Sequence, residues 1–235
     1  MALRSRAVTI LGLALLALLA WAYLLSGAGM PMMQGMAMAP PGFATVAAMW
    51  WVMMVAMMIP AAAPTILIYA QVHRRSKGIE TPPPTAAFLG GYLACWLGFA
   101  VIAGALQSWL ISPMSMAIGD RRAAAALLII AGLYQLSPLK NACLGRCRSP
   151  AQFLSRHYRP GALGAVRLGL LHGAYCVGCC WLLMALLFVG GVMNLIWVAG
   201  LTLVVAAEKL LPGGHWLAAI AGIAMILWGA ALMIG

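Results

Sequence analysis

The sequence predicts an all-α membrane protein, a polytopic bundle of about seven transmembrane helices with a cytoplasmic amino terminus. The first observation behind this prediction is composition: 65% of the 235 residues are hydrophobic and only 7% are charged, more apolar surface than a soluble domain can bury. The second is that runs of about 20 apolar residues recur along the chain, each long enough to cross roughly 30 Å of hydrocarbon. The third is that these runs are continuous rather than alternating, which favours helices over a membrane β-barrel.

Seven such spans can be drawn, and we expect them to form one integral membrane domain over residues 1–235. They lie at roughly 7–25, 43–70, 85–111, 122–139, 163–189, 192–211 and 215–234. The first span follows Arg4 and Arg6 and resembles a signal peptide, but its apolar region is long for that role. We therefore expect a retained first helix that is peripheral to a core at 43–212.

Positive charge predicts the orientation of the bundle. Lys and Arg total 14, and with these spans only Arg121 and Arg122 fall on the side opposite the amino terminus. Cytoplasmic loops carry an excess of Lys and Arg, so the amino terminus is expected in the cytoplasm and the carboxyl terminus outside it. This orientation explains the formal net charge of +11, and no nucleic-acid partner is expected.

The outer loop after the first span is rich in methionine. It reads SGAGMPMMQGMAMAP from Ser26 to Pro40, and its thioethers belong to Met30, Met32, Met33, Met36 and Met38. A thioether is a soft, uncharged ligand that suits monovalent copper or silver and binds hard cations poorly. The loop therefore either contacts metal or lies as a flexible apolar segment on the bilayer surface.

Methionine continues into the second span, which contains MWWVMMVAMMIPAAAP. Met49, Met53 and Met57 recur every four residues and share one helical face. Packing is the usual role of such a stripe, but this one begins where the methionine-rich loop ends, so Met53 and Met57 are candidate metal ligands. Pro60 and Pro64 free backbone carbonyls and kink the helix, which often marks an internal cavity.

The inner loop LKNACLGRCRSPAQFLSRHYRPG carries Cys143 and Cys147. Their spacing puts both sulfurs on one face of a helix, and the reducing cytosol argues against a disulfide. The pair suits metal binding or redox chemistry, although two cysteines do not complete a tetrahedral zinc site. The alternative is a basic loop on anionic lipid with incidental thiols.

The fifth span holds the densest group of metal-ligating side chains, in and just before AYCVGCCWLLM. His172, Cys176 and Cys180 follow an i, i+4, i+8 pattern, and Cys179 touches the same side of the helix. Hydrocarbon cannot solvate a thiolate, so ionised cysteines here need a cation. A buried soft-metal site meets that requirement. The alternatives are an embedded dithiol that passes electrons and cysteines that only fill space.

One acidic residue falls near the inner end of the sixth span. Glu208 is one of only three Asp and Glu residues in the chain, and an acid in or near a bilayer is a functional candidate. The simpler interpretation is structural, with Glu208 paired to the neighbouring Lys209 or to a loop arginine at the cytoplasmic interface.

Five separated motifs resemble those of a known family. They are MWWVMMVAMMIPAAAP at 49–64, YQLSPLKNACLGRCRSP at 134–150, YCVGCCWLLM at 175–184, GGVMN at 190–194 and EKLLP at 208–212. In this order they resemble the uncharacterised bacterial family of predicted metal-binding integral membrane proteins. The resemblance covers roughly 43–212 and implies a multi-pass protein of the bacterial inner (cytoplasmic) membrane that associates with metal. It implies neither an activity nor a ligand set.

These features together predict a copper-handling membrane protein without a catalytic site. The methionine loop would collect monovalent copper, the methionine face of the second span would pass it inward, and the cysteines would hold it for uptake, handling or delivery to a membrane cuproenzyme. Other soft metals, such as silver, suit the same donors. Its partners would be the lipid bilayer and that cuproenzyme or other membrane subunits. Two alternatives stay open: an accessory or structural subunit of a larger membrane enzyme complex, and a membrane thiol oxidoreductase.

Overall fold

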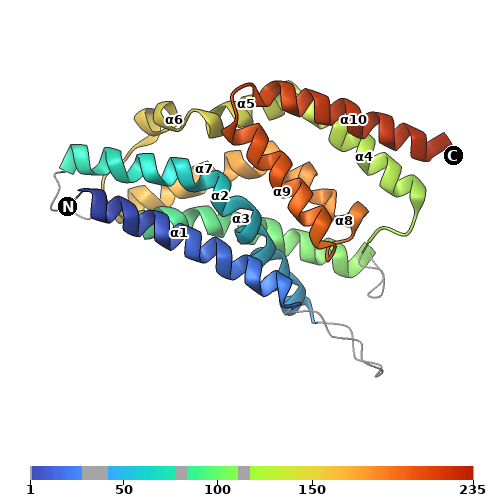
Figure 1. Cartoon of the computed structure of the whole chain (residues 1–235), viewed down its shortest axis with the longest axis horizontal. Coiled ribbons are helices and arrows are strands. Elements are labelled where there is room, and N and C mark those ends of the chain that lie inside the picture. The colour runs from blue at the N-terminus through green and yellow to red at the C-terminus, as the bar shows by residue number, and fades with distance from the viewer. Residues whose placement is uncertain (1, 28–41, 78–83, 111–116, 235) are drawn as a thin grey trace.

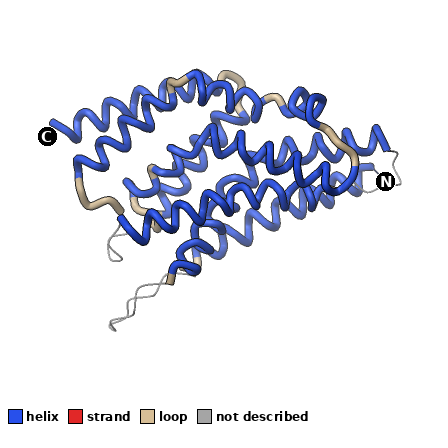
Figure 2. The backbone as a smooth tube through the Cα atoms, turned by 180° about the vertical axis from the view of Figure 1, so that it is seen from behind, coloured by secondary structure: helices blue, strands red, loops and turns tan. Residues whose placement is uncertain are grey.

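The computed structural model describes residues 2–27, 42–77, 84–110 and 117–234, and every regular element in these ranges is a helix (Figures 1 and 2). The helices are α1 (Ala2–Leu25), α2 (Phe43–Lys77), α3 (Thr85–Leu110), α4 (Arg121–Gln135), α5 (Pro138–Arg148), α6 (Pro150–His157), α7 (Gly161–Ala185), α8 (Leu187–Gly190), α9 (Leu195–Leu210) and α10 (Gly214–Ile234). The two termini lie at opposite ends of an elongated bundle (Figure 1). The predicted all-α fold is confirmed.

Five of the expected spans coincide with helices that are long and apolar enough to cross a membrane. They are Arg6–Leu25, Phe43–Arg74, Thr85–Trp109, Gly161–Gly190 and Gly214–Ile234. The expected span at 192–211 becomes α9, whose 16 residues fall short of that length. The described ranges therefore hold five such helices, or six if the bent pair α4–α5 is one span. The predicted number of seven and the predicted orientation are not confirmed.

The bend between α4 and α5 has a local chemical cause. Pro138 begins α5 and has no N–H to donate to the carbonyl four residues earlier, so the helix cannot continue through it. Ser137 then caps α5 by accepting a hydrogen bond from the Lys140 N–H at 3.2 Å, as an N-cap residue does. The two helices meet at 62°, which turns α5 toward α7 instead of extending α4.

α7 packs most extensively on α3, and two glycines allow their backbones to approach. A methyl group at Gly169 of α7 would overlap the carbonyl oxygen of Phe88, and one at Gly91 of α3 would overlap that of Val166. Small residues are the usual means by which helices come this close. α4 and α10 form a second extensive pair, and α7 also contacts α5 and α9. The middle of α7 is thereby enclosed by other helices.

α1 is attached to α2 at the point where proline interrupts the hydrogen bonds of α2. Pro60 lacks an N–H, so the Ala56 carbonyl loses its helical partner. Trp21 of α1 donates its indole N–H to that oxygen at 3.2 Å. The opposite face of α1 remains apolar and uncovered, with Leu11 and Leu18 each 67% exposed.

Candidate metal site

α7 places its three cysteines inside the bundle. The Cys176, Cys179 and Cys180 side chains are buried, and the Sγ atoms of Cys179 and Cys180 lie 3.1 and 2.9 Å from the Cys176 carbonyl oxygen, to which both thiols donate. One turn of helix therefore presents three thiols side by side, as their spacing predicts. All six cysteines of the chain are free thiols.

α5 brings a fourth thiol to this turn. The Cys147 thiol interacts with those of Cys176 and Cys179. Cys143 lies against Gly178 of α7, where an added methyl group would be 3.0 Å from the Cys143 Sγ. Gly178 thus leaves room for α5 to approach. The two groups of cysteines that are separate in the sequence meet in space, with Cys147 inside the group and Cys143 at its edge.

Lys209 of α9 points its ammonium group into these thiols. Its Nζ lies 2.9 Å from the Cys176 Sγ, 3.9 Å from the Cys180 Sγ and 4.0 Å from the Sδ of Met58 on α2. We use the name sulfur cluster for the five sulfur-bearing residues that gather near the Lys209 ammonium: Met58, Cys147, Cys176, Cys179 and Cys180. A buried positive charge already sits among sulfur atoms that come from two different helices, so the fold accommodates a cation there.

Tyr92 of α3 and His172 of α7 border the sulfur cluster. The Tyr92 hydroxyl lies 3.1 Å from the Cys176 Sγ and 3.3 Å from the Met58 carbonyl oxygen, to which it donates. The His172 ring is stacked on Tyr92, with ring centroids 5.7 Å apart. Its side chain is buried, and its Nδ1 has no hydrogen-bond partner among the described residues. An unpaired nitrogen in a buried imidazole is unusual and fits a donor kept available for a metal.

The sequence suggested that Glu208 pairs with Lys209 or with a loop arginine, but its carboxylate pairs with neither. Its carboxylate binds the Lys140 ammonium at 2.6 Å and accepts a hydrogen bond from Gln135 at 2.8 Å. Consecutive residues of a helix point about 100° apart, so Glu208 faces the α4–α5 bend while Lys209 faces α7. The Arg148 guanidinium donates to the backbone carbonyls of Glu208, at 3.0 Å, and Leu211, at 2.8 Å, and not to the Glu208 carboxylate. The Glu208 carboxylate therefore serves a buried ion pair next to the sulfur cluster.

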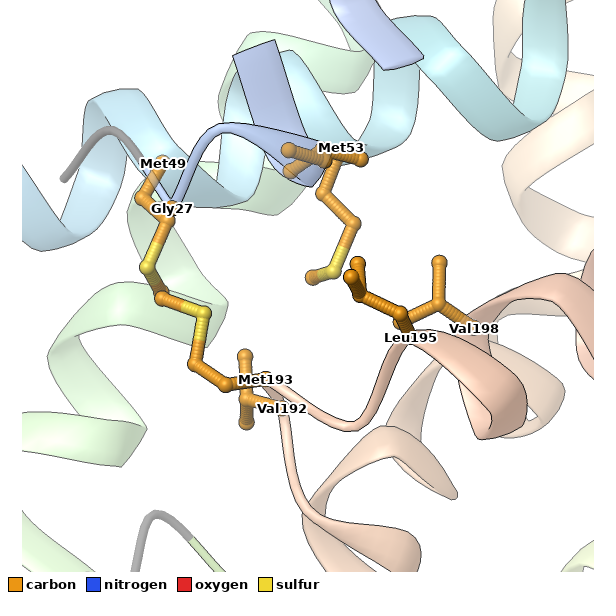
Figure 3. A pocket seen from close by; sticks show the side chains of 8 residues that line it. Gly27, Met49, Met53, Val192, Met193, Leu195 and Val198 are labelled. Carbon is orange, nitrogen blue, oxygen red and sulfur yellow. The ribbon is translucent and has the colours of Figure 1, made fainter. Parts of the chain in front are cut away.

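The predicted methionine ligands divide into three groups. Met53 lines a pocket together with Met49 and Met193 (Figure 3). Met57 is buried but does not line that pocket. The five methionines of the outer loop, Met30, Met32, Met33, Met36 and Met38, lie outside the described residues. Met58, which the sequence did not single out as a ligand, is the methionine that reaches the cysteines.

The sulfur cluster has the donors for a soft cation but not the geometry of a closed site. Within the described ranges, no three His, Cys, Asp or Glu side chains converge on one point in coordinating geometry. Metal–thiolate bonds are about 2.3 Å long, shorter than the distances from Lys209 to the sulfurs. Thiols that now donate to the Cys176 carbonyl would have to rotate inward, and the ammonium would have to withdraw, for a metal to be held.

Two residues that contact the sulfur cluster were not predicted from the sequence. Lys209 carried a usable signal, because a lysine inside an apolar span is itself a functional candidate, but it was assigned to Glu208. Tyr92 carried none, since a tyrosine in an apolar helix is ordinary and its partner Cys176 is 84 positions away.

Comparison with known proteins identifies a family. The model of a family described as PpoB2, copper chaperone, matches residues 47–232, which includes α3 to α9 and the whole sulfur cluster. Searches of curated proteins and of solved structures each found no match.

Proposed function

Because the chain belongs to the PpoB2 family of copper chaperones, we propose that it is a membrane-embedded chaperone that holds monovalent copper on the sulfur cluster. The observation that carries the proposal is the position of the Lys209 ammonium, 2.9 Å from the Cys176 Sγ and within 4.0 Å of two further sulfurs. A cation already occupies the place where soft donors meet. Copper would take a position among the same sulfurs.

The donor set favours copper in its monovalent form. Thiolate and thioether ligands select soft ions such as Cu(I), while carboxylate and carbonyl oxygens suit hard ions such as Mg²⁺ and Ca²⁺. The carboxylate of Glu208, which precedes Lys209 on α9, is bound by Lys140 and Gln135. Because the Glu208 oxygens are already engaged, they are not available to replace the water molecules bound to a hard divalent cation. The site therefore favours ions that prefer sulfur ligands.

Lys209 also solves the charge problem of a buried copper centre. Cuprous ion between two thiolates carries a net charge of −1, and an unpaired charge in a low-dielectric interior is strongly unfavourable. Lys140 and Glu208 already neutralise each other, whereas no carboxylate of the described residues forms a salt bridge with Lys209. We assign it as the counterion that makes the copper-loaded site neutral.

We further propose that the protein works in the bacterial inner membrane and delivers copper to a membrane cuproenzyme. Helices long and apolar enough to span a bilayer support the location, and the excess of Lys and Arg on one side of the spans drawn from the sequence supports a cytoplasmic amino terminus. The family match supports a role in copper handling. It gives no support to the two alternatives, an accessory subunit without metal and a thiol oxidoreductase.

The experiment is cuprous binding to the full chain purified in mild detergent under anaerobic, reducing conditions. The unmodified protein should bind copper stoichiometrically, and Cys176→Ser with Cys179→Ser should abolish tight binding. Cys95→Ser is the matched control, because Cys95 is a partly buried thiol of α3 outside the sulfur cluster. Full retention of copper by the double variant would overturn the assignment of the site.

A further inference from the structure

A second group of sulfur atoms converges at a different part of the bundle. Met49 and Met53 of α2 and Met193 of the turn between α8 and α9 line one pocket. Figure 3 shows their thioether side chains extending into the same space from these two elements. Met49 and Met53 are almost wholly buried, at 3% and 2% exposed. The copper site at the cysteines makes no use of these three methionines.

The turn that carries Met193 is held in place from both sides. Gly191 has φ of +90°, a backbone conformation that residues other than glycine rarely adopt. The Trp197 ring covers Gly190 so closely that a methyl group at Gly190 would overlap the ring. Asn194 caps α9 by accepting from the Trp197 N–H at 3.2 Å. The Trp197 indole N–H donates to the Leu186 carbonyl at 2.8 Å. The GGVMN motif thus fixes the backbone from which Met193 projects.

The pocket suits one small, soft, monovalent ion. Its open volume is about 10 Å³, close to the space that one water-sized particle needs. The other described residues that line it are apolar, among them Leu24, Val192 and Val198. Thioethers are neutral soft ligands, so an ion bound there keeps its positive charge, and a divalent ion would be left with twice that charge in an apolar surrounding.

From this geometry we propose that Met49, Met53 and Met193 form a second, weaker site for monovalent copper or silver. This inference rests on the proposed copper function and adds a transfer site to it. Binding is weaker than at the sulfur cluster because three thioethers leave the charge of the ion uncompensated, whereas thiolates cancel it. Met53 and Met58 are five residues apart on α2, about 7.5 Å along the helix axis at 1.5 Å per residue. The same step turns about 140° around the axis, so the two sites lie on different sides of α2, and transfer from the pocket to the sulfur cluster lowers the free energy of the ion.

The test uses Ag(I), which binds the same donors and does not change oxidation state. In a chain whose four sulfur-cluster cysteines, at 147, 176, 179 and 180, are replaced by serine, we expect one silver ion per chain by equilibrium dialysis in detergent. Met193→Leu or Met53→Leu in that background should raise the dissociation constant at least tenfold. Met54→Leu is the matched control, because Met54 is equally buried on α2 and does not line the pocket.

Each outcome separates this inference from the proposed function. Should the cysteine variant fold poorly, the same methionine substitutions in the cysteine-complete chain must remove only the weaker of two bound silver ions. If the complete chain binds a single silver ion that is lost with the cysteines, the second site is refuted and the proposed function stands. If Met193→Leu leaves the weaker ion bound, the second site is likewise refuted. If the complete chain binds neither copper nor silver, the proposed function itself fails.

Discussion

Removal of the positive charge next to the thiols should weaken copper binding. In Lys209→Met the side chain keeps much of its apolar length but loses the ammonium that lies 2.9 Å from the Cys176 Sγ and 3.9 Å from the Cys180 Sγ. The copper-loaded site of the variant would then hold an uncompensated charge of −1. We expect correct folding and a clear loss of cuprous affinity.

The size of the loss follows from the distances. Two unit charges 4 Å apart interact by about 4 kcal/mol at an effective dielectric constant of 20, and each 1.4 kcal/mol is a factor of ten in affinity. At this separation, close to the 3.9 Å between the Lys209 Nζ and the Cys180 Sγ, the full interaction corresponds to about a thousandfold. The measured loss should be smaller, because in the copper-free protein the same ammonium already stabilises a thiolate. We expect a reduction between roughly tenfold and a thousandfold on this Coulomb estimate.

The assay is competition with a chromophoric cuprous chelator in detergent, under anaerobic and reducing conditions. Arg167→Met is the control for loss of one positive charge, because Arg167 lies on the exposed side of α7, and it should leave the affinity unchanged. Lys209→Arg should retain most of it. An affinity of Lys209→Met equal to or higher than that of the unmodified protein would show that the ammonium competes with copper, and would refute its role as counterion.

Three further substitutions test the site and its support. Glu208→Gln leaves the Lys140 ammonium buried without its partner and should lower the stability to unfolding in detergent by about 3–5 kcal/mol, most of which the apolar pair Lys140→Met with Glu208→Leu should restore. Gly169→Ala forces α7 away from the Phe88 carbonyl and should cost about 1–3 kcal/mol in the same unfolding measurement, whereas Gly12→Ala, which meets open space, should cost nothing. Cys147→Ser should reduce cuprous affinity more than Cys143→Ser does, because only the former removes a thiol that interacts with both Cys176 and Cys179. If the two variants bind cuprous ion equally well, Cys147 of α5 is not a ligand.

Local sequence patterns were enough to predict the features that lie within a single helix. Continuous apolar runs predicted the helices, and the spacing of Cys176, Cys179 and Cys180 predicted their shared face. The limits of α9 were predicted less well, because its 16 residues follow a turn whose glycines do not interrupt an apolar pattern. The break before Pro138 was likewise hidden inside a run that reads as one span with a polar end.

Contacts between helices were beyond such patterns. Nothing local indicates that Cys147 lies against Cys176, since the turn of α5 toward α7 depends on the bend at Pro138 and on the space at Gly178. The adjacent charges Glu208 and Lys209 suggested a pair, yet helical geometry separates them and tertiary packing gives each a different partner. Met193 stood in a short turn with no periodicity to connect it to Met53.

The most direct measurement of the central claim is X-ray absorption at the copper edge on the chain loaded with one equivalent of cuprous ion. The account predicts Cu(I) in a first shell of sulfur, at distances of about 2.3 Å as in metal–thiolate bonds, joined by no more than the one nitrogen of His172, and the loss of this signal in Cys176→Ser with Cys179→Ser. A first shell of nitrogen or oxygen, or an unchanged sulfur shell in the double variant, would contradict it.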